Sequence, residues 1–304
     1  MNWFFIAILG PLFWSLSNHT DKFLLGKHLK GIGKEALILY STLVGLVMLP
    51  IAYMFNHHVL SVGLKNAVIL MVAGCFSSLG IYLYLYALED DDASLVVPFW
   101  QTIPIFGFIL GFILFKETLT IQQYIGSAII ILGAVILSLE ISELRKVKLK
   151  KKLAVMMLAS SLLFALYEAL FKFTALEDGF WLSTFWQYAG LFLFGVILFS
   201  WRKKYRKDFL YLIQKHNWRF FSINMINEGA TIIGNTFYNF SLLLAPLALV
   251  MTTISYQPVF VFVEGLLLTL FFPQISRENT SFKHLAHKAL CIAIVLIGTV
   301  ILYN

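Results

Sequence analysis

Residues 98–137 have the sequence PFWQTIPIFGFILGFILFKETLTIQQYIGSAIIILGAVIL, in which two apolar runs flank the short polar segment KETLT. Each run approaches the roughly 20 residues that an α-helix needs to cross the hydrocarbon core of a bilayer. Pro104 falls inside the first run, where it removes a helical hydrogen bond and frees a carbonyl group. The segment predicts two consecutive membrane-spanning helices, the first of them kinked.

The whole chain has the composition of an integral membrane protein. Of its 304 residues, 60% are hydrophobic and 13% are charged, with a mean hydropathy of +0.82, whereas a soluble domain carries about twice that charged fraction. The period-two alternation of a transmembrane barrel is absent. We therefore expect an all-α integral membrane protein with ten transmembrane helices, over residues 3–23, 36–55, 66–88, 93–115, 121–139, 153–175, 181–200, 218–244, 247–272 and 286–302.

The net charge of +7 is concentrated in alternate connections between these spans. Nineteen of the 23 Lys and Arg residues lie in or beside four of them, including RKVKLKKK (145–152) and RKKYRK (202–207). Under the positive-inside rule these connections are cytoplasmic, which puts both termini outside the cytoplasm. The charge therefore indicates orientation in a bacterial-type inner membrane, and we expect no nucleic-acid partner. The first apolar stretch, which begins MNWFF, is expected to stay as a helix and not to be cleaved as a signal peptide.

The sequence contains no motif for a cofactor or a metal. The two cysteines, Cys75 and Cys291, fall within expected spans and give no support to a disulfide framework or a zinc cluster. Nucleotide-binding loops and common hydrolase motifs are missing as well. We expect no cofactor, no metal and no enzymatic activity. The alternative, a membrane-embedded enzyme, needs clustered acids, histidines or a nucleophile at one interface, and the sequence scatters these residues.

The two halves of the chain are similar to each other. At an offset of 154 residues, nine of 32 positions in the third and fourth spans meet an identical residue in the eighth and ninth, among them Pro104 and Pro258. Five spans per half force the second half to enter the membrane from the opposite side. The sequence therefore predicts two inverted five-helix repeats, 1–140 and 153–304, joined by a basic connecting loop, 141–152.

Ten spans in a five-plus-five arrangement, the segment 98–137 and its partner SYQPVFVFVEGLLLTLFF (255–272) resemble the drug/metabolite transporter (DMT) superfamily, EamA type. The matching features are a proline-kinked fourth helix that ends in an acidic residue, Glu117, and a Gly-rich fifth helix that includes Gly126. One position departs from the pattern, because Phe271 stands where Glu117 would recur in the second half. The resemblance implies a transporter with a cavity built mainly from helices 1, 3, 4, 6, 8 and 9, and it favours export of an amino acid or a related compound.

A polar face interrupts the eighth span, within NMINEGATIIGNTFYN (224–239). Its members are three or four residues apart, which places Asn224, Glu228, Thr231 and Asn235 on one side of a helix. Such a face cannot point at lipid and must look into protein or water. Glu228 lies about 15 Å into a core of about 30 Å, deeper than any other acid. We expect it to bind a cationic group of a substrate or to exchange a proton during transport.

Other polar and aromatic residues in the spans extend the candidate binding site. Several surround the two prolines, where freed backbone groups offer further donors and acceptors, and tryptophan can wall a cavity or hold a cation. Glu168 is also spaced to form an ion pair with Lys172, one helical turn further on. The additional candidates are Trp14, Asn18, Trp100, Gln101, Glu168, Tyr256 and Gln257.

The expected function is secondary transport of a small polar or amphipathic metabolite across the inner membrane by alternating access, with or without proton coupling at Glu228. The expected partners are a small-molecule substrate, protons and membrane lipids, and the sequence does not specify an oligomeric state. A lipid-linked carrier or flippase would use the same architecture with a laterally open, aromatic-lined cavity, so it stays as an alternative.

Overall fold

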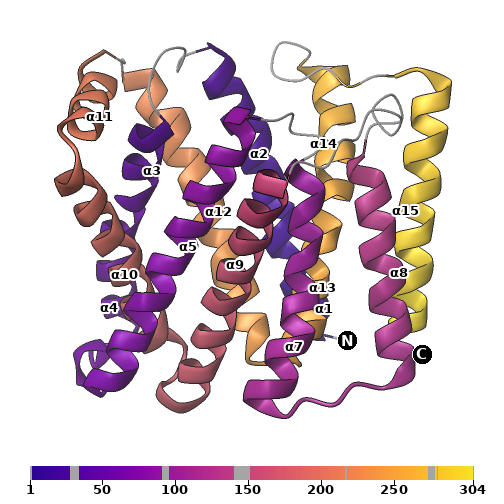
Figure 1. Ribbon diagram of the computed structural model, residues 1–304, viewed down its shortest axis with the longest axis horizontal. Coiled ribbons are helices and arrows are strands. Elements are labelled where there is room, and N and C mark those ends of the chain that lie inside the picture. The colour runs from indigo at the N-terminus through magenta and orange to yellow at the C-terminus, as the bar shows by residue number, and fades with distance from the viewer. Residues whose placement is uncertain are drawn as a thin grey trace.

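Figure 1 shows the computed structural model, a bundle of long helices that run side by side between two ends. It describes residues 2–27, 34–90, 96–139, 151–215, 218–272, 278 and 280–303. Every regular element within these ranges is helical, and both chain termini lie toward the same end of the bundle (Figure 1). The all-α class expected from composition is confirmed.

The helices follow the order expected from the apolar runs. The first half contributes α1 (Asn2–Ala7), α2 (Leu9–Lys27), α3 (Lys34–Thr42), α4 (Val44–Phe55), η1 (Val59–Ser61), α5 (Leu64–Asp90), η2 (Val97–Thr102), α7 (Ile103–Phe115) and α8 (Ile121–Ser138). The second half contributes α9 (Lys151–Asp178), α10 (Phe180–Trp201), α11 (Lys203–Lys215), α12 (Trp218–Leu242), α13 (Leu247–Thr252), η3 (Thr253–Tyr256), α14 (Gln257–Phe271) and α15 (Phe282–Tyr303). Most of the expected connecting loop, residues 141–150, lies outside the described residues.

Eight helical segments are long and apolar enough to span a membrane. They include every expected span except the first and the eighth, which correspond to α1–α2 and α12. These two also form helices, and α2 packs along α12 within the bundle. They carry more polar side chains than the other eight, because α12 holds the polar face and α2 ends in Asp21, Lys22 and Lys27. Ten spans therefore remain a prediction.

Both predicted proline kinks coincide with a change of helix type. A 3-10 segment, η2, precedes α7, and Pro104 lies in the first turn of α7. In the same way η3 precedes α14, whose first turn contains Pro258. Proline is tolerated in the first turn because the N–H that it lacks would have no helical partner there. The prolines thus start new helices after each interruption.

The turn between α7 and α8 is fixed by local chemistry. Lys116 ends α7 in the left-handed backbone region, with a φ of 56°. α8 begins with a capping box, in which the Thr120 side chain accepts from the Gln123 amide and the Gln123 side chain accepts from the Thr120 amide. This turn, between α7 and α8, lies at the end of the bundle toward which both termini lie (Figure 1).

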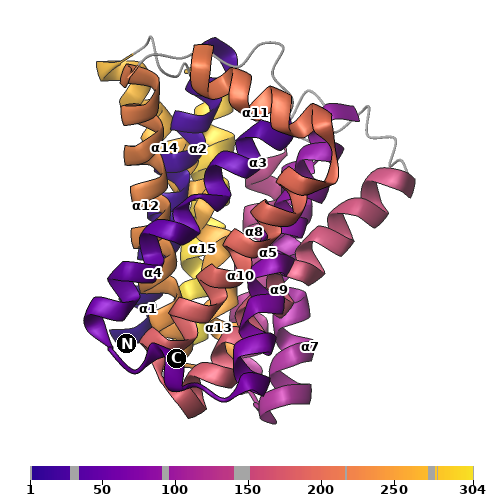
Figure 2. The ribbon, with the colours of Figure 1, turned by 90° about the vertical axis from the view of Figure 1, so that its left-hand side faces the viewer.

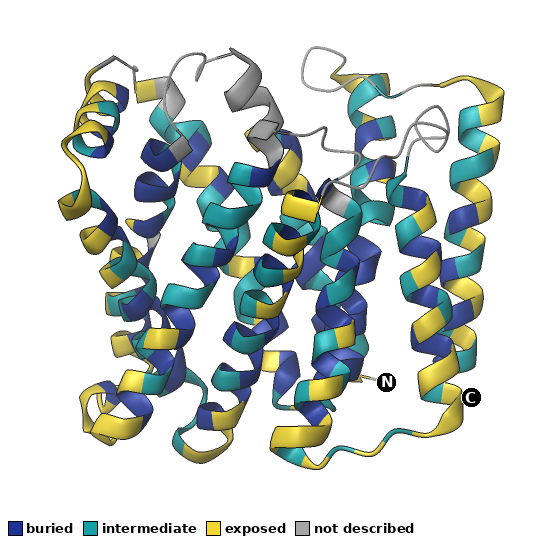
Figure 3. Ribbon diagram, in the orientation of Figure 1, coloured by how far each residue is buried: buried dark blue, intermediate teal, exposed yellow. Residues whose placement is uncertain are grey.

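Glycine allows the closest helix crossings. A β-carbon on Gly74 of α5 would lie 2.1 Å from the Gln187 carbonyl oxygen of α10, and one on Gly190 would lie 2.1 Å from the Met71 carbonyl oxygen. Neither crossing leaves room for a side chain, so α5 and α10 touch backbone to backbone. Figure 3 shows the result across the bundle, with buried residues facing the interior and exposed residues covering the outer faces of the helices.

One helix was not expected from the sequence. The basic segment that begins RKKYRK, interpreted as a loop, forms α11. Figure 2 shows α11 across the end of the bundle opposite to both termini, at an angle to the long helices. The sequence interpretation counted only long apolar runs, and α11 is short, with lysines among its apolar residues.

The α5–α10 crossing makes a matched pair of glycine substitutions informative. Gly74→Ala should destabilise the protein by about 1–3 kcal/mol, because the added methyl group overpacks the crossing. Gly229→Ala in α12 should be neutral or stabilising, since no atom lies within 4 Å of the β-carbon position and alanine favours the helix by about 1 kcal/mol. Thermal unfolding in detergent measures both. Equal melting temperatures for the two variants would contradict the assigned crossing.

Candidate functional site

The polar face of α12 is turned into the bundle. Its side chains form hydrogen bonds to residues of three other helices: Thr231 donates to Ser17 of α2, Glu228 accepts from Ser41 of α3, and Asn239 donates to Gln187 of α10. This is the environment that a polar stripe in a membrane helix requires, because lipid offers no hydrogen-bond partners. The stripe therefore joins α12 to both halves of the chain.

Glu228 and Asp21 bring two carboxylates into one region. The Ser41 hydroxyl donates to Glu228 Oε1 over 2.6 Å, and the Asn227 amide nitrogen donates to Asp21 Oδ1 over 2.7 Å. Asp21 is close enough to Glu228 to affect it electrostatically. Neither Asp21 nor Asn227 was among the predicted site residues, although Asn227 directly precedes Glu228 in α12. This region can hold a cationic group or a proton.

A second group of polar atoms surrounds Asn235, further along α12 toward its C-terminal end. The indole N–H of Trp14 donates to Asn235 Oδ1 over 2.8 Å, and the Asn235 amide nitrogen lies 3.4 Å from the Tyr188 hydroxyl. The rings of Trp14 and Tyr238 are 5.0 Å apart. Tyr188 is within electrostatic range of both Glu228 and Glu168. Aromatic rings thus surround the polar face of α12 near Asn235.

The remaining candidates are only partly brought together. Trp100 packs its ring on Tyr84, with centroids 4.3 Å apart, in the core that also includes Trp14. Tyr256 belongs instead to a separate core beside α8 and α15, where its hydroxyl contacts Thr299. The other candidates differ in burial: Gln101, Gln257, Glu168 and Asn224 are buried, whereas Asn18 is exposed on α2.

Several of these buried groups have polar atoms without a hydrogen-bond partner among the described residues. A buried polar atom that stays unsatisfied costs about 1–3 kcal/mol, so such atoms are uncommon in stable interiors unless water or a ligand meets them. Three of the six near the candidate site belong to predicted residues, and the other three belong to α12. The six are Trp100 Nε1, Gln101 Oε1, Glu168 Oε2, Asn227 Oδ1, Tyr238 OH and Asn239 Oδ1.

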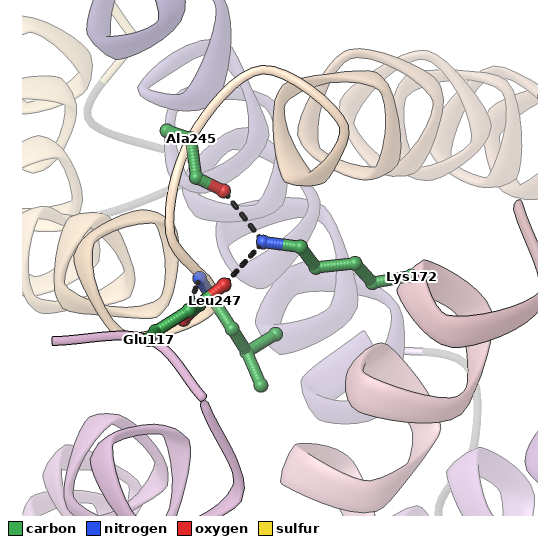
Figure 4. Close-up of polar contacts among 4 residues, drawn as sticks. All are labelled: Glu117, Lys172, Ala245 and Leu247. Atoms are coloured by element: carbon green, nitrogen blue, oxygen red, sulfur yellow. Dashed lines mark hydrogen bonds and ion pairs between the residues drawn. The ribbon is translucent and has the colours of Figure 1, made fainter. Parts of the chain in front are cut away.

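The predicted ion pair between Glu168 and Lys172 is wrong. Lys172 Nζ lies 2.6 Å from Glu117 Oε1 and donates to the Ala245 carbonyl oxygen over 2.7 Å, as Figure 4 shows. The second oxygen of Glu117 accepts from the Leu247 amide over 2.7 Å. Residues far apart in sequence thus give Lys172 two acceptor groups, a carboxylate and a backbone carbonyl, in place of the carboxylate of Glu168 one turn away. The cluster ties α9 to the α7–α8 turn and to the α12–α13 connection.

A counterpart of Glu117 exists in the second half, at a position that the sequence offset missed. A β-carbon on Gly111 would lie 2.6 Å from Glu117 Oε2, and one on Gly265 would lie 2.8 Å from Glu278 Oε1. Gly111 and Gly265 are related by the offset of 154. The connection after α14 is longer than the one after α7, so the acid falls seven residues beyond Phe271.

The sequence analysis also missed Ser41 and Tyr188. A single serine in an apolar helix carries no spacing signal, and a tyrosine among many aromatic residues is not distinguished from lipid-facing ones. The repeat gives no signal either, because at an offset of 150, which relates Lys22 to Lys172 in the first spans of the two halves, Tyr188 corresponds to Ile38. Among the described residues, no group of three His, Cys, Asp or Glu side chains is arranged to hold a metal ion.

Comparisons with known proteins point to one family. Residues 1–139 match the EamA-like transporter family. An uncharacterised protein of Methanocaldococcus jannaschii is 30% identical over 97 residues, which cover 32% of this chain and 71% of that protein. A solved crystal structure superimposes with a TM-score of 0.68 over 100% of this chain and 98% of its own, at 13% sequence identity. The last comparison shows a shared fold alone.

The Glu117–Lys172 cluster predicts a large effect from a single substitution. Lys172→Met should destabilise the protein by about 3–5 kcal/mol, because it removes the cation from the Glu117 carboxylate, whose side chain is only 13% exposed. The double variant Glu117→Gln/Lys172→Met should regain most of this loss, since neither remaining side chain is charged. Thermal unfolding provides the measurement, with the exposed Lys65→Met as the control. A Lys172→Met variant as stable as the control would show that the pair contributes nothing.

Proposed function

The chain belongs to the EamA-like transporter family, and we propose that it is a secondary transporter which moves a small polar or amphipathic metabolite across the inner membrane by alternating access. The substrate class that we propose is an amino acid or a related compound, moved in the direction of export, as the family resemblance implies. The charged connections support an orientation with both termini outside the cytoplasm.

The observation that carries this proposal is the position of Glu228. It lies in the middle of α12 on a face that contacts α2, α3 and α10, and among the residues that the structure describes a single serine hydroxyl donates a hydrogen bond to it. An acid in a membrane helix is costly, at roughly 2.5–3.5 kcal/mol on insertion scales, and such residues mark substrate or proton pathways. Glu264 also accepts from a serine, and Glu228 differs from it by lying on the polar face of α12 that contacts three other helices.

Alternating access requires two halves that can exchange roles, and two reciprocal contacts support such a pseudo-twofold arrangement. Gly45 of α4 packs on Phe192 of α10, and Gly195 of α10 packs on Thr42 of α3. An offset of 150 converts the first pair of residues into the second. Each contact is thus the counterpart of the other, as expected when two repeats face each other across an axis in the membrane plane.

The same relation holds for the crossings of α5 with α9 and of α12 with α2. A β-carbon on Gly80 would lie 3.0 Å from the Phe164 ring, and one on Gly234 would lie 3.1 Å from the Trp14 indole nitrogen. Gly80 corresponds to Gly234 at the offset of 154, and Trp14 corresponds to Phe164 at 150. The repeated geometry supports five-helix repeats as the unit of architecture.

Glu228 breaks this symmetry at a decisive place. Its counterpart is Gly74, and Ser41 corresponds to Leu191. A β-carbon on Gly74 would lie 2.5 Å from the Leu191 amide nitrogen, whereas Glu228 reaches Ser41 through its whole side chain. One half therefore has direct backbone contact where the other has a carboxylate. The contact of α12 with α3 is the counterpart of the contact of α5 with α10. Binding of substrate or a proton at Glu228 can therefore shift the equilibrium between a state closed at the first contact and a state closed at the second.

A ligand screen tests the assignment of Glu228. Purified protein is warmed with amino acids, amines, nucleotides and sugars, and we expect a zwitterionic or cationic compound to raise the melting temperature. Glu228→Gln should lose that shift, because the amide cannot pair with a cation. Glu264→Gln should keep it and serves as a matched control, since Glu264 is also a membrane acid that accepts from one serine, Ser15, over 2.8 Å.

A shift that persists in Glu228→Gln would remove this residue from the binding site. If no water-soluble compound shifts the wild-type protein while lipid-linked compounds do, the protein is a lipid-linked carrier or flippase instead.

Transport in liposomes tests proton coupling separately. With the ligand from the screen, wild-type uptake should depend on the pH difference across the membrane, because a titrating Glu228 exchanges a proton in each cycle. Glu228→Gln should transport at a rate that does not change with pH, or not at all, and Glu264→Gln should behave as wild type. A pH dependence that is unchanged in Glu228→Gln would exclude Glu228 as the coupling group.

A further inference from the structure

α11 divides its side chains among three directions. Tyr205, Phe209 and Leu212 are buried, while Lys203, Lys204 and Lys207 are exposed. At 100° per residue, the three lysines fall on the side opposite to the buried residues. Leu210 and Ile213, exposed to 48% and 40%, fall between these two sides on one flank, where the half-buried Arg206 lies between them and adds to the positive charge.

The buried side fixes α11 to the transport bundle. Tyr205, Phe209 and Leu212 pack in one core with residues of α3 and with Leu198 of α10, and the rings of Phe199 and Phe209 are 6.1 Å apart. α11 is therefore a rigid part of the bundle and not a tethered segment. Its exposed lysines are held in place with respect to the helix ends around them.

The exposed side carries a concentrated positive charge. Arg202 directly precedes the helix, with its guanidinium 6.0 Å from the Tyr205 ring, and three lysines follow within five residues. Asp208, the one acid in α11, is half-buried on the flank away from Leu210 and Ile213. A surface of this charge complements anions, and phosphodiester groups are the anions that a membrane surface supplies in quantity.

The residues at each end of α11 indicate that it lies at the level of the lipid headgroups. Trp201 ends α10 and is 71% exposed, and Trp218 starts α12 and is 83% exposed. Tryptophan at a helix end favours the interface between hydrocarbon and water. α11 connects these two tryptophans, so its apolar flank of Leu210 and Ile213 can face acyl chains while its lysines face phosphates.

We propose that α11 is a docking surface for anionic phospholipid headgroups of the membrane. Lys203, Lys204 and Lys207 bind the phosphates, and Leu210 and Ile213 rest on the adjoining acyl chains. A soluble anion would be attracted by the lysines alone and would leave the apolar flank in water. Because α11 packs on α3, the helix that carries Ser41, the lipid surface is coupled mechanically to the neighbourhood of Glu228.

Native mass spectrometry of the full-length protein in neutral detergent tests this surface. The protein is titrated with 1-palmitoyl-2-oleoyl phosphatidylglycerol or with the corresponding phosphatidylcholine. Wild type should bind the phosphatidylglycerol in preference. The variant Lys203→Gln/Lys204→Gln/Lys207→Gln should lose affinity for it by about tenfold or more, because each lysine near an anionic surface contributes roughly fivefold.

A second triple variant removes the same charge elsewhere. Lys65→Gln/Lys151→Gln/Lys283→Gln changes three exposed lysines outside α11 and should keep the preference of wild type. Thermal unfolding checks that both triple variants are folded. Equal phosphatidylglycerol binding by wild type and the α11 variant would overturn the proposal, as would an equal loss in both triple variants. A changed oligomeric mass with unchanged lipid binding would show that another protein copy covers α11, and would also overturn it.

Discussion

A polar side chain in the hydrocarbon region has to find its partner inside the protein, and this constraint organises the bundle around α12. Ser17, Ser41 and Gln187 come from three different helices, and each meets a polar residue of α12. Packing of apolar surfaces alone gives little preference for one arrangement over another, because lipid is as apolar as the side chains. The directional hydrogen bonds of α12 therefore select which helices surround it, and they place Glu228 among them.

The features that could be predicted from the sequence involve residues that are uncommon in lipid-facing helices, namely polar side chains and prolines. The polar stripe around Glu228 and the matched prolines, Pro104 and Pro258, stand out against an apolar background, so their periodicity and recurrence are readable. The offset of 154 makes Gly74 the counterpart of Glu228. Its backbone contact with α10 shows why one half needs a glycine there.

The features that could not be predicted depend on contacts across the fold. Lys172 has a favourable neighbour in Glu168, yet it pairs with Glu117, because the α7–α8 turn and the α12–α13 connection converge on it (Figure 4). Glu278 could not be found by comparing the two halves without gaps, because the connection after α14 is longer than the one after α7. In the structure it nevertheless packs on Gly265 as Glu117 packs on Gly111. α11 was missed because a helix at a membrane surface needs only one narrow apolar side, far less than a spanning helix does.

A cysteine thiol lies at the crossing of α5 and α10 and can report on whether the two helices touch. The Cys75 thiol lies 3.4 Å from the Gly190 carbonyl oxygen, one residue beyond the tightest backbone contact, and Cys291, the other cysteine, is buried in α15. While the two helices touch, the sulfur is screened on that side by the neighbouring main chain. Cys75 is half-buried, and a state in which the helices part would uncover that side of the sulfur as well. The rate at which the Cys75 thiol is alkylated would then measure how often α5 and α10 separate, without an engineered label.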